Sequence, residues 1–185
     1  YDQALWLLLQ WGWERLGRSG SHVDMASRLI VLREAAYELF RLRPEANDFG
    51  QSEIESKVRE VLQHLGYGGL AVDEVMKEWE QAGILQEAGR ERGEMRMAFL
   101  HRSFLEYLAG LTLARRLESD WAQWASFVDR KAWHPAWREA LVFMGWALSK
   151  EGTLQKLVSL LADPKRNDCF RHRLALALRI LAERV

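Results

Sequence analysis

His101 is the side chain whose type and position point most directly to chemistry. It follows residues 97–100, a short apolar segment typical of a buried strand. It precedes Ser103 and Glu106, whose S-x-x-E spacing predicts the capped N-terminus of a helix. The backbone turns at such a junction, so an imidazole can point outward, donate a hydrogen bond to an anion and become cationic beside it. The alternative interpretation is a histidine that only caps or packs at the junction.

No catalytic or metal-binding pattern accompanies His101. The glycines of segment 66–69 are not followed by the Lys and the Ser or Thr of a phosphate-binding loop. The five histidines lack the His-x-x-x-His spacing of a zinc site, and no Ser, His and Asp set has support in the sequence. We therefore predict that the chain is not an enzyme and that it holds neither a cofactor nor a metal on its own.

Helical periodicity and capping residues dominate the rest of the sequence. Phe104, Leu108 and Leu111 form the expected core stripe of the helix after His101, and Tyr107 is expected in the core as well. Two short apolar segments, 84–86 and 96–100, predict a β-hairpin with a polar turn over residues 87–94. Further helices are expected at residues 5–16, 25–39, 52–65, 74–82, 120–128, 135–149, 153–161 and 168–185.

The pattern of the C-terminal third of the sequence predicts paired helices. Two apolar stripes carry this pattern: Trp137, Leu141, Met144 and Leu148, then Phe170, Leu174, Leu178 and Leu181. Breaks at Gly152 and at residues 163–164 separate the helices, as in HEAT-type solenoid repeats. The basic residues from Lys165 onward are expected to form a solvated flank, although they could face an acidic partner or nucleic acid.

The composition excludes several classes of protein. The chain of 185 residues has 26 Lys plus Arg and 26 Asp plus Glu, so its formal net charge gives no general attraction to nucleic acid or to an anionic membrane. The single cysteine, Cys169, excludes a disulfide framework and fits a reducing cytoplasm. The apolar runs at 4–9 and 140–148 are far shorter than the roughly 20 residues of a membrane span. We expect a cytoplasmic protein without a membrane partner, cut from a longer chain.

The pattern F-x-H-x-S-F-x-E-Y-x-A resembles the strand–helix junction of the winged-helix region in NACHT-type signalling NTPases, the STAND class, of the prokaryotic NLR-like kind. The matching residues are Phe99, His101, Ser103, Phe104, Glu106, Tyr107 and Ala109, with Gly110 where the family usually has a second alanine. By this resemblance, residues 1–20 end a preceding helical domain, 21–118 form the winged helix, and 119–185 form a superhelical, HEAT-like segment. The flanking parts match by pattern alone.

The resemblance implies a regulatory function. The family's histidine at this place contacts the β-phosphate of ADP in the NTPase core, so His101 would sense whether ADP or ATP, with Mg²⁺, is bound in the parent protein. The chain would then be the arm that couples the nucleotide to autoinhibition and oligomerisation. Its partners would be the NTPase core of the same polypeptide and, in the active parent protein, further copies of itself.

The expected fold class is therefore mainly α: a winged helix with one β-hairpin, followed by a HEAT-like helical solenoid. The competing interpretation is a stand-alone interaction module or a DNA-binding regulator. The second helix of the winged helix would contact DNA, and it carries Asp73, Glu74, Glu78 and Glu80 against Lys77 alone. Because affinity for DNA depends largely on basic contacts to phosphate, nucleic acid is a disfavoured partner.

Overall fold

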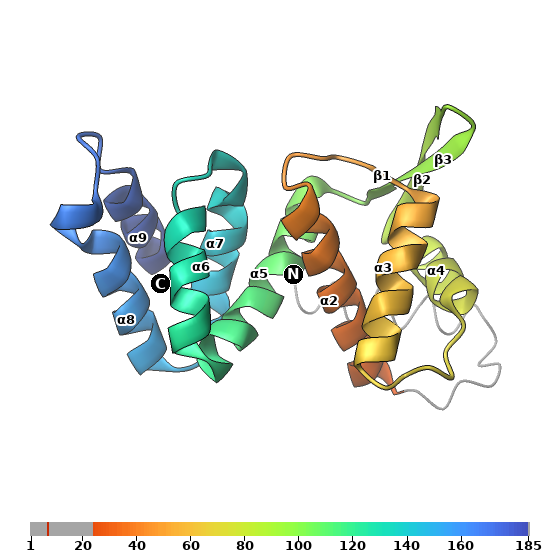
Figure 1. Cartoon of the computed structure of the whole chain (residues 1–185), viewed down its shortest axis with the longest axis horizontal. Helices are drawn as coiled ribbons and strands as arrows, with labels where there is room; N and C mark the ends of the chain where they lie inside the picture. The colour runs from red at the N-terminus through yellow and green to blue at the C-terminus, as the bar shows by residue number, and fades with distance from the viewer. Residues whose placement is uncertain (1–6, 8–23, 185) are drawn as a thin grey trace. The chain divides into compact units, whose positions relative to one another are not determined.

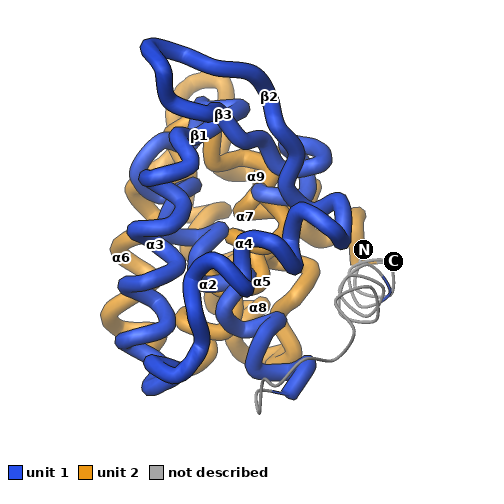
Figure 2. Tube along the Cα trace, turned by 90° about the vertical axis from the view of Figure 1, so that its right-hand side faces the viewer, with its two compact units in different colours: residues 1–105 blue, residues 106–185 orange. Residues whose placement is uncertain are grey.

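A computed structural model describes residue 7 and residues 24–184 of the chain (Figure 1). These residues are mainly α-helical, with eight α-helices, two short 3-10 helices and one small sheet among them. The chain divides into two compact units, residues 1–105 and 106–185, which Figure 2 draws in different colours. None of the helices described is both long enough and apolar enough to cross a membrane. The helix expected at residues 5–16 lies outside the described residues.

The first unit places three helices before a hairpin. Asp24 is the N-cap of the first helix, and its carboxylate accepts a hydrogen bond from the backbone N–H of Ser27 at 2.7 Å. The elements are α2 (Met25–Leu42), β1 (Phe49–Gly50), α3 (Gln51–His64), α4 (Val72–Gln81), β2 (Leu85–Glu91), β3 (Glu94–Phe99) and the start of α5 (Arg102–Ser119). The segment before α3, expected to be a loop, therefore contains a short strand, β1. A strand of two residues is too short to give a recognisable pattern in the sequence.

The three strands form an antiparallel sheet in the order β1-β3-β2, in which Phe49 pairs with Met97. The hairpin predicted from the sequence is confirmed, but its turn is not the long one expected. Arg92 and Gly93 alone connect β2 to β3, and both have positive φ, as a tight type I′ turn requires. Both strands continue through the segment expected to be the turn, with a bulge between Glu87 and Gly89. The hairpin extends beyond α3 and α4 (Figure 1).

Large side chains fill the interior of the first unit. The aromatic residues Tyr37, Phe40, Phe49 and Trp79 are each at most 1% exposed. Helices α2 and α3 pack against each other, and α4 packs against α3 and β2. Trp79 is thus a packing residue, and the core of this unit depends on the volume of its side chains.

The second unit is entirely helical within the residues described. Its elements are the rest of α5, α6 (Trp121–Lys131), the 3-10 helix η1 (Pro135–Trp137), α7 (Arg138–Ala147), α8 (Glu151–Ala162), the 3-10 helix η2 (Pro164–Arg166) and α9 (His172–Ala182). Helix α6 packs on α8, and α7 packs on α9, which also contacts α8 (Figure 1). The predicted stripe of Trp137, Leu141, Met144 and Leu148 is confirmed, since each is at most 2% exposed.

Two glycines allow helices of the second unit to approach closely. A Cβ atom added to Gly110 of α5 would lie 2.7 Å from the carbonyl oxygen of Ala140 and 2.7 Å from the Cβ of Phe143, both in α7. A Cβ atom added to Gly145 of α7 would overlap the side chain of Ile180 in α9. Gly110 is therefore a packing requirement of the α5–α7 contact.

The predicted apolar stripe of the last helix is wrong. Phe170, Leu178 and Leu181 are 77%, 60% and 40% exposed, and α9 begins only at His172. The buried face of α9 instead consists of Arg173, Leu176, Ala177 and Ile180. The helix carries two apolar stripes, and the close approach of Ile180 to Gly145 determines which of them packs inward.

Candidate functional site

The junction around His101 is fixed to the sheet by backbone hydrogen bonds. Strand β3 ends at Phe99, and the N–H of Leu100 donates to the carbonyl of Ile84 at 2.9 Å. Met97 and Phe99 are buried, as predicted. Leu100 is not, because its side chain is 48% exposed. The buried part of the segment therefore ends at Phe99, one residue earlier than expected. His101 itself lies exposed at the surface.

The His101 ring is oriented by the residue two positions ahead. Its Nδ1 atom lies 3.1 Å from the backbone N of Ser103 and 2.7 Å from the Oγ of the same residue. A backbone N–H can only donate, so Nδ1 is the acceptor and the ring proton resides on Nε2. This tautomer leaves an N–H donor on the exposed edge of the ring.

The structure differs from the capping box predicted for Ser103 and Glu106. Helix α5 begins at Arg102, so Ser103 lies in its first turn rather than at the N-cap position. The acceptor at the helix start is His101 Nδ1, which occupies the place that a side-chain oxygen of Asp or Asn usually takes. Glu106 is buried, at 6% exposed, and belongs to the interior of the helix. The sequence pattern was compatible with either assignment, since S-x-x-E does not show which acceptor is nearer.

Arg102 anchors the junction to a distant loop. Its guanidinium donates to the carbonyl oxygens of Pro44 at 2.6 Å and Glu45 at 3.0 Å, and to Asn47 Oδ1 at 3.2 Å. These contacts hold the loop between α2 and β1 against the start of α5. No pattern in the sequence indicates this role of Arg102, because its acceptors lie more than fifty residues away and two of them are backbone carbonyls. The anchor thus ties the residue next to His101 to the loop before β1.

The aromatic residues of the motif are core residues, as predicted. Phe99 and Phe104 are 5% exposed, and Tyr107 is completely buried. The ring of Tyr107 stands edge-on to that of Phe143 in α7, with centroids 5.4 Å apart. The motif thus combines a buried aromatic framework with one exposed imidazole.

Helix α4 presents an acidic surface. Its exposed charged residues are Asp73, Glu74, Glu80 and Lys77. Glu78, the fourth acid of the helix, is buried and pairs with Arg28 of α2. An exposed face with three acids and one base repels the phosphates of DNA.

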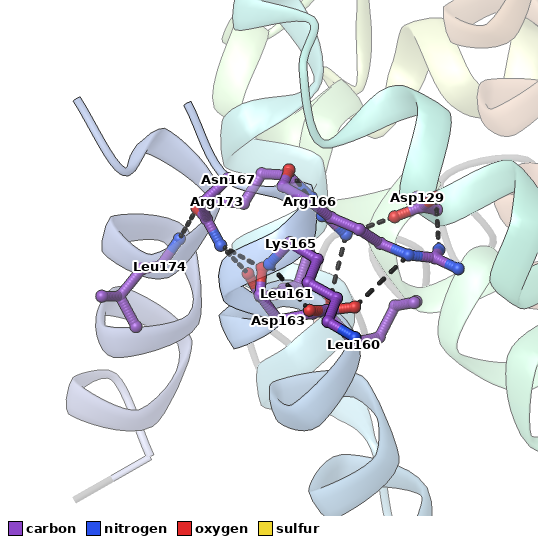
Figure 3. A network of polar contacts seen from close by, with 9 residues as sticks. All are labelled: Asp129, Leu160, Leu161, Asp163, Lys165, Arg166, Asn167, Arg173 and Leu174. Atoms are coloured by element: carbon purple, nitrogen blue, oxygen red, sulfur yellow. Dashed lines mark hydrogen bonds and ion pairs between the residues drawn. The ribbon is translucent and has the colours of Figure 1, made fainter. Parts of the chain in front are cut away.

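The basic C-terminal segment is largely solvated, as expected, since Lys165, Arg166, Arg171 and Arg184 are exposed, but Arg173 is an exception. Arg173 is completely buried, pairs with Asp129 of α6, and donates to the carbonyl oxygens of Leu160 at 2.9 Å and Arg166 at 3.0 Å (Figure 3). The remaining contacts of the segment are also internal. Arg166 pairs with Asp129, Arg179 pairs with Glu139, and Arg184 donates to the carbonyls of Gly145 and Leu148. Four of its six basic residues thus also connect parts of the second unit.

Among the residues described, no group of three or more His, Cys, Asp or Glu side chains is arranged to hold a metal ion. No protein-family model and no curated protein matches the chain. The functional interpretation therefore depends on the geometry around His101.

Proposed function

We propose that this chain is the regulatory arm of a nucleotide-switched signalling ATPase of the STAND class with a NACHT-type core. In this proposal His101 contacts a phosphate of ADP bound by the NTPase core of the same polypeptide. The hydrogen bonding of the imidazole supports this proposal best. Nδ1 accepts the backbone N–H of Ser103, so Nε2–H remains as a donor on an exposed ring.

The fold assignment that accompanies the proposal is a winged helix followed by a HEAT-like segment. The winged helix is supported by the order α2, β1, α3, α4, β2, β3 and by the sheet order β1-β3-β2, in which the short first strand pairs with the outgoing strand of the hairpin. The HEAT-like segment is supported by the stacking of α6 on α8 and of α7 on α9.

The proposed switch is a two-state equilibrium biased by the nucleotide. A hydrogen bond from the imidazole to an anionic phosphate is worth about 1.5–3 kcal/mol, and only the ADP-bound, closed state would make it. Arg102 contributes by fixing the base of His101, so little conformational freedom is lost when the ring meets the phosphate. Loss of the contact would increase the open population by roughly tenfold to a hundredfold.

The test uses two substitutions that separate capping from anion binding. His101→Asp keeps a side-chain acceptor for the N–H of Ser103 but carries no donor, whereas His101→Ala removes both. In the isolated chain, thermal melts should show His101→Asp close to wild type and His101→Ala less stable by up to about 1 kcal/mol. In the complete polypeptide, both variants should release ADP faster and oligomerise without a trigger.

The outcome for His101→Asp in the complete polypeptide decides the proposal. If this variant retained ADP normally and did not oligomerise without a trigger, His101 would act only as a helix cap. The proposal also requires a phosphate-binding loop in the NTPase core of that polypeptide, while the isolated chain should show no Mg²⁺-dependent ATP binding by calorimetry.

A DNA-binding regulator is the alternative, and it makes the opposite prediction for nucleic acid. A fluorescence-anisotropy titration of the chain with duplex DNA at low salt should show no binding, because of the acidic surface of α4. Salt-dependent binding in that titration would favour the alternative.

A further inference from the structure

Ser103 directs two donors at the same ring nitrogen of His101. Its backbone N lies 3.1 Å from Nδ1, and its Oγ atom lies 2.7 Å from Nδ1. The backbone N–H can only donate, so Nδ1 offers a lone pair to it. An oxygen 2.7 Å from that lone pair must direct its own proton toward it, because two lone pairs at this distance repel each other. The Ser103 hydroxyl is therefore a donor to His101, in the shorter of the two contacts.

The two contacts differ in how they depend on the side chain at position 103. Every residue except proline would supply the backbone N–H, whereas the second donor requires a hydroxyl close to the backbone, as in serine or threonine. Helix α5 begins at Arg102, so Ser103 lies in its first turn and is held by the helix in a fixed position relative to the ring. The hydroxyl is thus the part of Ser103 that distinguishes it from another helical residue.

We propose that Ser103 is a positioning residue for His101, whose hydroxyl holds the ring in the tautomer and orientation that present Nε2–H to an anionic phosphate. This inference rests on the proposed function, because the phosphate is that of the nucleotide in the NTPase core. The hydrogen bonds form a chain, from the hydroxyl to Nδ1 and from Nε2–H to the phosphate. A donor at Nδ1 makes Nε2–H a stronger donor, since hydrogen bonds in a chain polarise one another. Ser103 acts through His101.

The exposure of His101 gives the hydroxyl its importance. An exposed side chain changes rotamer freely unless a specific contact holds it. A neutral imidazole in water also exchanges its proton between Nδ1 and Nε2. A ring with its proton on Nδ1 would present only the lone pair of Nε2, which repels a phosphate oxygen. Two donors at Nδ1 disfavour that tautomer and limit the rotation of the ring.

Nitrogen NMR of the isolated chain measures the tautomer directly. In long-range ¹H–¹⁵N spectra of a neutral imidazole, the shifts of the two ring nitrogens differ most when one tautomer is populated, and less when the tautomers mix. Wild-type His101 should show a large difference, with Nδ1 as the unprotonated nitrogen. Ser103→Ala should reduce the difference, and Ser103→Thr, which keeps the hydroxyl, should restore it. The spectrum of His101→Asp identifies the signals of His101 among those of the five histidines.

The complete polypeptide tests the consequence for the nucleotide. Ser103→Ala should release ADP roughly threefold to tenfold faster than wild type, the effect of losing one ordinary hydrogen bond. Ser103→Thr should release ADP at the wild-type rate. Ser126→Ala is the matched control, because Ser126 is an exposed helical serine whose Oγ also makes a hydrogen bond of 2.7 Å, in this case with Arg130. That variant should change neither the ring signals of His101 nor the release of ADP.

A purely structural role for Ser103 would give a different result. If the hydroxyl only stabilised the first turn of α5, Ser103→Ala would lower the melting temperature and leave the ring signals unchanged, which would overturn the proposal. Faster ADP release from His101→Asp but not from Ser103→Ala would overturn it as well. If the ring signals change as expected while both variants retain ADP normally, the function proposed for His101 fails and the positioning of its ring by Ser103 is confirmed.

Discussion

The core of the first unit and the α5–α7–α9 stack of the second unit hold their elements together in different ways. In the first unit, large aromatic side chains such as Phe40 and Trp79 fill the space between three helices and a sheet. In the stack, glycines bring helices into near contact, and Gly110 and Gly145 leave no room for a Cβ atom. Polar contacts then fix neighbouring helix ends, with Arg173 and Glu118 as the main donor and acceptor.

This difference in packing determines which substitutions each region tolerates. A core that depends on side-chain volume is weakened most by truncation, because the surrounding atoms relax only in part. A stack that depends on close approach is weakened by added volume, and its polar contacts are weakened by the loss of a donor or of a charge. The predictions below test this contrast.

Phe104→Ala should have the largest effect, a loss of about 3–5 kcal/mol in the free energy of unfolding, because it leaves a cavity beneath the junction. Phe104 is 5% exposed. Urea denaturation measures the loss, and Leu100→Ala is the control, since that leucine is 48% exposed and its truncation should cost under about 0.5 kcal/mol. Equal effects of the two substitutions would refute the buried framework of the motif.

Arg173→Met should cost about 2–4 kcal/mol, because it removes the buried donor to two carbonyl oxygens and the partner of Asp129. The expected loss stays within this range because Asp129 is 26% exposed and can regain water. Arg171→Met, at an exposed arginine two residues away, should change the stability by less than about 0.5 kcal/mol. If both substitutions proved neutral, the Arg173 network would contribute no net stability.

Gly110→Ala and Gly152→Ala should have opposite signs. At Gly110 the added methyl group meets the backbone of α7, and the strain, about 1–3 kcal/mol, exceeds the gain of about 1 kcal/mol in helix propensity. At Gly152, in the first turn of α8, nothing lies within 4 Å of the added Cβ, so the same change should stabilise the protein by up to about 1 kcal/mol. Thermal melts of both variants would show whether close approach rather than propensity determines the outcome.

Glu118→Gln should have the smallest effect, a loss of about 0.5–1 kcal/mol near neutral pH. Glu118 of α5 accepts the backbone N–H groups of Ser149 and Lys150 at the start of α8, each at 2.7 Å. Burial alone would raise the pKa of Glu118, but these hydrogen bonds, that of the Ser149 hydroxyl and the charge of Lys150 together lower the pKa below its usual value of 4.5.

The sign of the pH dependence follows from that lowered pKa. The contribution of Glu118 to stability is complete above its unfolded-state pKa and is lost as the pH falls through its lower folded-state pKa. The stability difference between wild type and Glu118→Gln should therefore be constant near neutral pH and should vanish in acid. A difference that persists at a pH well below 4.5 would show that the charge is not responsible.

Local patterns in the sequence were sufficient for much of the fold. The hairpin and the stripe from Trp137 to Leu148 depend on residues close together in the chain, and the structure confirms them. The burial of Phe104 and Tyr107 was also predictable, because their spacing places them on one side of a helix. The exposure of His101 follows from its place between a strand and a helix.

Long-range contacts decided the rest. The anchoring of Arg102 on Pro44, the burial of Arg173 and the choice between the two apolar stripes of α9 all depend on partners that lie far away in the sequence. In α9 the hydrophobic periodicity was real for both faces, so it could not identify the inner one. The close approach permitted by Gly145 selects the face that carries Ile180, because two helices can come so near only where one of them has no side chain.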